Sequence, residues 1–184
     1  MSVGCSDKCV SGFLGTDSVE RFSADNPNID VVNYRGYHRL LPALHFTCNT
    51  TITSISVGAK RVFGGGTPEI QIWRPQEGQE NFFLIRRIHL AEMTTTEDPG
   101  VYKFIVTASV AVQERDIVSV YEVMSSSLEL YNERDVGIYP LSIPIDEGND
   151  DIPPPDDDWP LLSIETSNEQ FMLCAEVMCY YFMC

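Results

Sequence analysis

The chain has 184 residues, of which 43% are hydrophobic and 10% aromatic, so it can bury one core and is too apolar to stay disordered throughout. Its formal net charge of −15 repels phosphate backbones, which argues against nucleic acid as a partner. We therefore expect one globular domain with a tail at each end.

Residues 1–38 contain turn residues such as Asn26-Pro27-Asn28 and show no sustained periodicity. We expect an irregular lead-in there, with at most one strand near residues 30–34. The first fifteen residues lack the charged and apolar regions of a signal peptide. This pattern indicates either a cytosolic protein or a fragment of a longer chain.

From residue 39 to about 168 the sequence consists of short β-branched and aromatic runs separated by turn residues. The runs cover residues 44–48, 51–60, 68–74, 81–90, 100–108, 115–123, 127–132 and 159–166. About eight strands of this kind predict an all-β fold, an antiparallel β-sandwich of the jelly-roll type. Gly64-Gly65-Gly66 lies between two runs and leads into a strand, so we expect a loop there and no phosphate-binding site.

Alternation predicts which side chains of two runs face the core. In the run 100–108 the core face carries Tyr102, Phe104, Val106 and Ala108. In the run 51–60 it carries Ile55, Val57 and Ala59. Ile52 is out of phase with the second set, which predicts a β-bulge or a strand start near Thr53-Ser54.

Six cysteines form three groups, Cys5 with Cys9, Cys48 alone, and Cys174 with Cys179 and Cys184. Their spacings do not match the C-x2-C pairs of common zinc sites, so we interpret them as structural disulfides or buried thiols of undetermined pairing. The tail at 169–184 is apolar from residue 171 onward except for Glu176. Its last fourteen residues are fewer than the roughly 20 of a complete membrane span. A truncated span, a last strand and a gene-model end remain the three interpretations.

Catalytic signatures are missing from the sequence. His38, His45 and His89 form no metal-ligand or catalytic spacing, and no G-x-S-x-G segment occurs. We therefore expect a protein that is not an enzyme.

Residues 146–158 hold seven acids and no base around Pro153-Pro154-Pro155. We interpret them as a solvated loop within the domain, with a calcium site and an acidic protein-docking patch as alternatives. The candidate calcium ligands are Asp150, Asp151, Asp156, Asp157 and Asp158. No other cofactor is expected.

Asn49 and Trp73 are the candidates for contacts outside the chain. Asn49-Thr50-Thr51 is a glycosylation sequon, which is used only in the secretory route. Trp73 precedes Arg74-Pro75 at the end of a run. Its ring is either a platform for a sugar or protein ligand, or part of the packing at the rim of the core.

The segments LLPALHFTCNTTITSISVGAK, PEIQIWRP, VQERDIVSVYE and DDDWPLLSIET resemble a domain of large, mostly uncharacterised receptor-like surface proteins of simple marine animals. The resemblance covers roughly residues 40–166. It is carried by Cys48, Ile70–Pro75, Asp116–Tyr121 and Pro160–Thr166. That pattern has glycine where this chain has Arg115, which puts its tight turn in doubt.

The resemblance implies an extracellular β-sandwich ahead of a membrane anchor or further modules, and it implies no catalytic residues. It also favours Asn49 as a glycan site. We accordingly expect a non-enzymatic binding or spacer domain of a cell-surface or secreted protein, with another surface protein or a glycan as partner. The alternatives are a calcium-dependent carbohydrate-binding β-sandwich that uses Trp73 and the acidic residues, and a cytosolic β-sandwich interaction protein.

Overall fold

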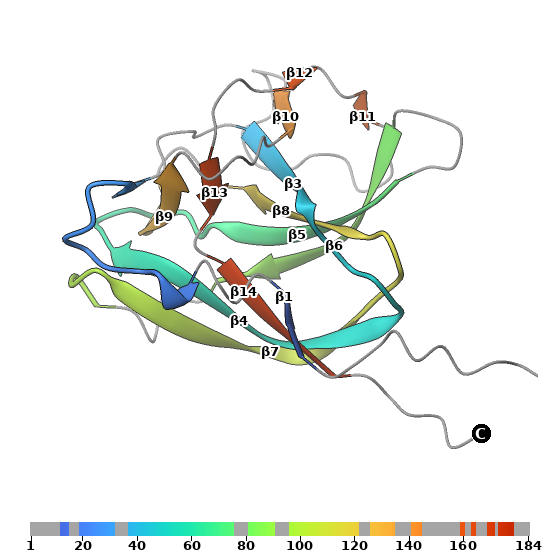
Figure 1. Cartoon of the computed structure of the whole chain (residues 1–184), viewed down its shortest axis with the longest axis horizontal. Helices are drawn as coiled ribbons and strands as arrows, with labels where there is room; N and C mark the ends of the chain where they lie inside the picture. Colours follow the sequence, from blue (N-terminus) through green and yellow to red (C-terminus); the bar gives the residue numbers. More distant parts are fainter. Residues whose placement is uncertain are drawn as a thin grey trace, which may run out of the picture.

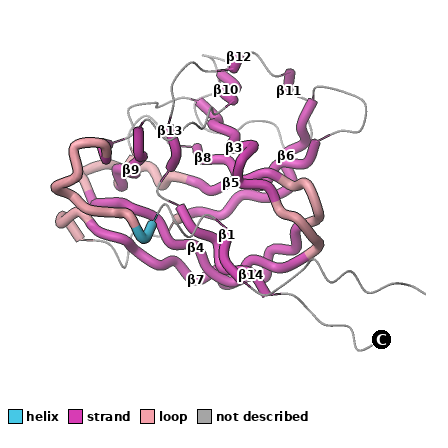
Figure 2. The backbone as a smooth tube through the Cα atoms, in the orientation of Figure 1, coloured by secondary structure: helices cyan, strands magenta, loops and turns pink. Residues whose placement is uncertain are grey.

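A computed structural model gives the fold of the chain (Figure 1). It describes residues 12–14, 19–31, 37–75, 81–90, 96–121, 126–134, 141–144, 159–160, 163–164, 169–171 and 173–178. Strands dominate these ranges, and residues 19 and 20 form their only helical stretch (Figure 2).

Two seven-stranded sheets make up the described fold, and all the strand pairs within them are antiparallel. The first contains β1 (Gly12–Leu14), β2 (Ile29–Val31), β4 (Thr50–Arg61), β7 (Gly100–Val112), β9 (Leu128–Arg134), β13 (Glu169–Phe171) and β14 (Leu173–Met178). The second contains β3 (Tyr37–His45), β5 (Glu69–Pro75), β6 (Asn81–His89), β8 (Ile117–Tyr121), β10 (Leu141–Pro144), β11 (Trp159–Pro160) and β12 (Ser163–Ile164). The expected all-β, antiparallel sandwich is confirmed.

Strand β4 organises the first sheet. It pairs with β7 over most of its length, with β14 through residues 51–57, and with β9 through residues 59–61. The second sheet runs in the order β11-β6-β5-β8-β3-β10-β12. Figure 1 shows β4, β7 and β14 in one layer and β5 and β8 in the layer above it.

The main core lies between these layers. Its members include Ile52, Ile55, Val57 and Leu173 from the first sheet and Leu41, Ile70, Ile72, Val118 and Val120 from the second. Each fully buried aliphatic side chain of this size contributes about 1.5–3 kcal/mol to folding. Burial of these side chains, which alternate along each strand, is therefore the main contribution that holds the two sheets face to face.

The sequence-based assignment of strand faces is confirmed except at one residue. Ile55, Val57, Ala59 and Phe104 are buried, and Tyr102 and Val106 pack against the core. The register between β4 and β7 shifts between Ile52 and Ser54, where the bulge was predicted. Ala108 is exposed, contrary to prediction, because residues 106–109 lie opposite the single Thr53 and lose the alternation.

Both ends of the chain contribute strands to the first sheet. Residues 1–38 include β1, which pairs with β14, and β2, which pairs with β9, where at most one strand was expected. At the other end β14 pairs with β4, so residues 173–178 form a strand, as one of the three interpretations of the tail had it. Most of the strands beyond the predicted eight have two to four residues, which is too short for a visible period.

The connection from β7 to β8 is a tight turn over residues 113–116. The Asp116 amide donates to the Gln113 carbonyl oxygen at 3.1 Å. Arg115 has a φ of 75°, in the left-handed region that disfavours side chains with a Cβ atom. The turn therefore forms without the glycine of the resembling pattern, at the cost of backbone strain in Arg115.

Replacing Arg115 by glycine is expected to raise the free energy of unfolding by about 1 kcal/mol, because glycine adopts this φ without a Cβ clash. Arg115→Ala is the matched control, since it shortens the side chain and keeps the clash. Urea unfolding of the three proteins measures the difference. Equal stability of the glycine and alanine variants would contradict a strained backbone at Arg115.

Candidate functional site

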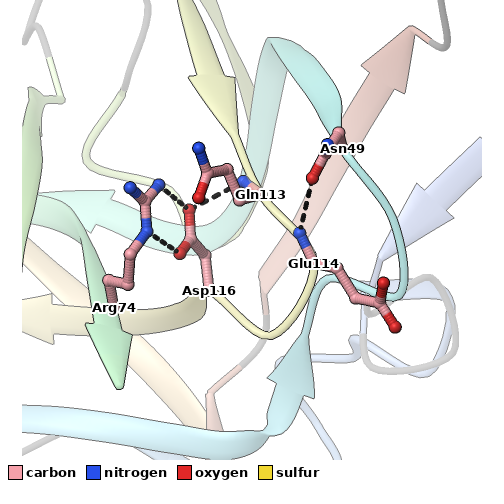
Figure 3. Close-up of polar contacts among 5 residues, drawn as sticks. All are labelled: Asn49, Arg74, Gln113, Glu114 and Asp116. Carbon is pink, nitrogen blue, oxygen red and sulfur yellow. Dashed lines mark hydrogen bonds and ion pairs between the residues drawn. The ribbon is translucent and has the colours of Figure 1, made fainter. Parts of the chain in front are cut away.

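The loop that carries Asn49 lies against the β7–β8 turn, and together residues 46–49 and 113–116 form what we call the loop–turn junction. The Phe46 amide donates to the Asp116 carbonyl oxygen at 2.9 Å, and the Arg115 amide donates to the Phe46 carbonyl oxygen at 2.7 Å. The Glu114 amide donates to Asn49 Oδ1 at 3.0 Å (Figure 3). Three hydrogen bonds thus fix the loop to the turn.

The carboxylate of Asp116 anchors the junction from inside. Its side chain is fully buried and accepts two bonds from Arg74, from Nε at 2.8 Å and from Nη2 at 2.9 Å (Figure 3). It also accepts the Gln113 amide at 2.8 Å. These hydrogen bonds raise the pKa of Arg74, so the guanidinium remains charged and the end of β5 is held to the turn.

The sequon straddles the boundary between surface and sheet. Asn49 is exposed in the loop, whereas Thr50 and Thr51 begin β4 and are buried. Thr50 Oγ1 donates to the Met178 carbonyl oxygen at 3.0 Å, which ties the sequon to β14. The structure therefore presents the asparagine to solvent from a loop whose neighbours are held in the sheet.

Cys48 precedes the sequon directly. It is intermediate in exposure and is disulfide-bonded, with a partner outside the described residues. Cys174, on β14, is a buried thiol. The loop–turn junction thus places an exposed sequon asparagine beside a cysteine engaged in a disulfide.

Trp73 does not offer a ligand platform in this structure, because it is 0% exposed. Its indole Nε1 donates to Gln71 Oε1 at 3.1 Å. Its ring packs with Leu40, Phe82 and Ile117 in a second, smaller core. The structure fits the interpretation that Trp73 packs in the core. It does not fit an exposed platform for a sugar or protein ligand, because the ring is buried.

Three buried polar side chains lie near Trp73, and we call them the buried polar row: Glu69 and Gln71 on β5 and His38 on the neighbouring part of the second sheet, β3. His38 Nδ1 lies 2.8 Å from Gln71 Oε1, and Gln71 Nε2 donates to Glu69 Oε2 at 3.0 Å. Glu69 Oε1 lies 3.4 Å from His89 Nδ1 and 3.7 Å from Arg87 Nη1. Through the contacts of Glu69 with Arg87 and His89 on β6, the row links β3, β5 and β6 of the second sheet.

Burial lowers the pKa of His38 to about 4, with the charge of Arg87 acting in the same direction and the hydrogen bond to Gln71 opposing both. The imidazole is therefore neutral at physiological pH. It stacks on Tyr121 at 4.8 Å between ring centroids and meets Trp73 edge-on at 5.5 Å. These contacts make the row part of the packing of the second sheet.

The candidate calcium ligands Asp150, Asp151, Asp156, Asp157 and Asp158 lie outside the described residues. Among the residues that the structure does describe, no group of three or more His, Cys, Asp or Glu side chains is placed to hold a metal ion. The described part of the chain also contains no helix long and apolar enough to cross a membrane.

The sequence identified Asn49 as a candidate and put the turn at Arg115 in doubt, and it did not reveal the residues that join the two. Arg74 and Asp116 belong to two separate motifs, and nothing in the sequence pairs them. The sequence around His38 shows only that this residue has no catalytic spacing to another histidine. The available signal was the charge of Asp116 at the start of a strand whose next five residues read IVSVY, since an acid in that position often caps a turn.

No protein-family model, curated protein or solved structure matches this chain.

Proposed function

We propose that the chain is a non-enzymatic binding or spacer domain that works outside the cell, on a cell-surface or secreted protein. The observation that carries the proposal is the loop–turn junction, where exposed Asn49 follows the disulfide-bonded Cys48. N-glycosylation and stable disulfides both belong to the secretory route. Two features of that route on adjacent residues support an extracellular location better than either does alone.

The surroundings of Asn49 support its use as a glycan site. Its side chain is exposed, so an attached sugar extends into solvent and does not displace the core. The hydrogen bond from the Glu114 backbone amide orients the side-chain amide of Asn49. The ion pair between Arg74 and Asp116 holds the turn to which Glu114 belongs. A glycan there would shield the loop–turn junction and leave the remaining surfaces to contact a protein or glycan partner at the cell surface.

Protein secreted from animal cells behind an added signal peptide is expected to lose mass on enzymatic removal of N-glycans. Asn49-Thr50-Thr51 is the only N-x-S/T triplet in the sequence, so the whole change must come from Asn49. Intact-mass spectrometry before and after the enzyme measures it. A wild-type protein that is secreted with the same mass in both samples would contradict the proposal.

Three variants separate loss of the glycan from damage to the loop. Asn49→Asp keeps an acceptor oxygen for the Glu114 amide and removes the glycan, and Thr51→Val removes the sequon while it fills the same buried space. Thr50→Val loses the bond to the Met178 carbonyl oxygen and keeps the sequon intact. We expect the mass change to vanish in the first two variants and to persist in the third.

A further inference from the structure

The folded first sheet covers two of the three residues of the sequon. Asn49 is exposed, whereas Thr50 and Thr51 are each only 7% exposed. We propose that the enzyme that transfers the glycan acts on Asn49 only while this segment is unfolded, so that the folded domain is not its substrate. The inference rests on the proposed use of Asn49 as a glycan site, and it states when that site is open.

Transfer of the glycan needs both ends of the sequon. The enzyme joins Asn49 Nδ2 to the anomeric carbon of a lipid-linked sugar, the bond from that carbon to the lipid diphosphate breaks, and the nitrogen loses one proton. The N-x-S/T rule shows that a hydroxyl two residues after the asparagine is recognised as well. In this chain that hydroxyl belongs to Thr51, which is buried. An exposed asparagine is therefore not sufficient for the reaction in the folded protein.

Neighbouring strands hold the sequon from both sides. Thr51 lies opposite Ala111 on β7 and opposite Met178 on β14. The Thr50 hydroxyl donates to the Met178 carbonyl oxygen at 3.0 Å. The residue that follows the sequon, Ile52, is fully buried in the main core. An enzyme that takes the sequon into its own site has to separate the start of β4 from both neighbours and draw Ile52 out of the core.

Both strands that close over the sequon are synthesised after it. Ala111 follows Thr51 by 60 residues, and Met178 follows Thr50 by 128 residues. At roughly 5–20 residues per second, Ala111 is added about 3–12 s after the sequon and Met178 about 6–26 s after it. The segment is thus open when it is made and is covered in two stages, first by β7 and then by β14.

Folding of the first sheet therefore competes with glycosylation. A chain that meets the enzyme before β7 and β14 pair with β4 receives a glycan, which then extends into solvent from the finished loop. A chain that folds first stays without one. The reason is that opening a strand held on both sides takes a large part of the free energy of global unfolding.

The test uses the full chain, purified from bacteria without a glycan and folded in glutathione buffer, with a purified transferase and its lipid-linked sugar donor. A synthetic peptide of residues 44–56 gives the rate for the open sequon. The folded chain is expected to react at least roughly a thousandfold more slowly, since only the opened molecules, a fraction of about 10⁻³ or less, can react. Intact-mass spectrometry follows both reactions.

Two variants make the same substitution inside and outside the core. Ile55 is fully buried, so Ile55→Asp should unfold the chain and restore transfer to near the rate of the peptide. Ile105 is 68% exposed, so Ile105→Asp should stay folded and react as slowly as the wild type. Circular dichroism verifies the folded state of each protein.

The outcomes separate this proposal from the proposed function. Equal rates for the folded wild type and the peptide would overturn the proposal and leave Asn49 as a glycan site. A peptide that accepts no sugar would overturn both, because Asn49 would then be no glycan site.

Pulse labelling in animal cells that secrete the full chain gives a second, independent readout. The glycosylated fraction of the labelled chains is expected to be set by the end of a short pulse. It should then stay constant while the protein folds and leaves the cell. A fraction that rises after the chains have folded would overturn the proposal.

Discussion

Asp116→Ala is expected to lower the free energy of unfolding by about 3 kcal/mol, at the lower end of the values for breaking a buried ion pair. The variant removes a fully buried carboxylate that accepts two hydrogen bonds from Arg74 and one from the Gln113 amide. The loss is limited because the Arg74 side chain is one-third exposed and can regain water. The Gln113 amide has less freedom, since the turn holds it.

The matched control for Asp116→Ala is Asp30→Ala. Asp30 accepts Arg134 Nη2 at 2.7 Å, but both side chains are about half exposed. Exposed pairs of this kind contribute less than about 1 kcal/mol, so the control should unfold at nearly the wild-type urea concentration. Equal losses in the two variants would show that the burial of Asp116 adds nothing to its ion pair.

Loss of Asp116 should also loosen the glycan-bearing loop. The Glu114 amide that donates to Asn49 belongs to the turn that the carboxylate anchors. Native-state hydrogen exchange is therefore expected to accelerate at Glu114 and Arg115 in the Asp116→Ala protein more than in the centre of β4. Uniform acceleration would indicate a global loss of stability without a local opening of the loop–turn junction.

Alternation along the sequence predicted well which side chains face the core. It predicted poorly whether the opposite, polar face of a strand is exposed. Ile55 and Val57 were recognised because every second residue of β4 faces the core. In β5 the same rule separates Ile70 and Ile72 from Gln71, and all three are buried. A period of two distinguishes the two faces of a strand but does not reveal whether the polar face is covered as well.

The loop–turn junction could not be predicted because its contacts join distant parts of the chain. Arg74 and Asp116 are 42 residues apart; Arg74 lies on β5, and Asp116 lies in the turn that precedes β8. A strand pattern does not state which strands are neighbours, and the antiparallel partner of β5 on this side is β8, which follows two other strands in sequence. The sequence shows that Arg115 stands where the resembling pattern has glycine. It does not show that hydrogen bonds with Phe46 and Asp116 sustain the turn.

Burial of His38 in the buried polar row is expected to limit the stability of the fold in acid. The pKa of His38 is about 4 in the folded protein and about 6.5 in the unfolded chain. Between these values the unfolded chain binds a proton that the folded protein does not, so its free energy falls relative to that of the folded state. The stability contributed by neutral His38 is thus complete above pH 6.5 and is lost as the pH falls toward 4.

The expected loss attributable to His38 is about 2 kcal/mol between pH 7 and pH 5 and about 3 kcal/mol once the pH reaches 4. Urea unfolding at several pH values between 7 and 5 measures it mostly above the range where carboxylates titrate. His38→Phe keeps a ring to stack on Tyr121 and cannot titrate, so its stability should decline less over this range by the same 2 kcal/mol. His38→Gln cannot titrate either, but it lacks the aromatic ring. If the smaller dependence of stability on pH comes from the lost titration and not from ring packing, this variant should show the same dependence as His38→Phe.

His45→Gln is the control for this experiment, because it removes an imidazole from the exposed surface. The groups that face His38 from neighbouring strands are Gln71 and Glu69 on β5, Arg87 on β6 and Tyr121 on β8. Arg87 opposes a second positive charge in the row, so protonation has to disrupt the packing around Trp73 and Tyr121 to let water in. If the His38 variants and the wild type lose stability in parallel from pH 7 to pH 5, burial of this imidazole does not set the acid limit of the fold.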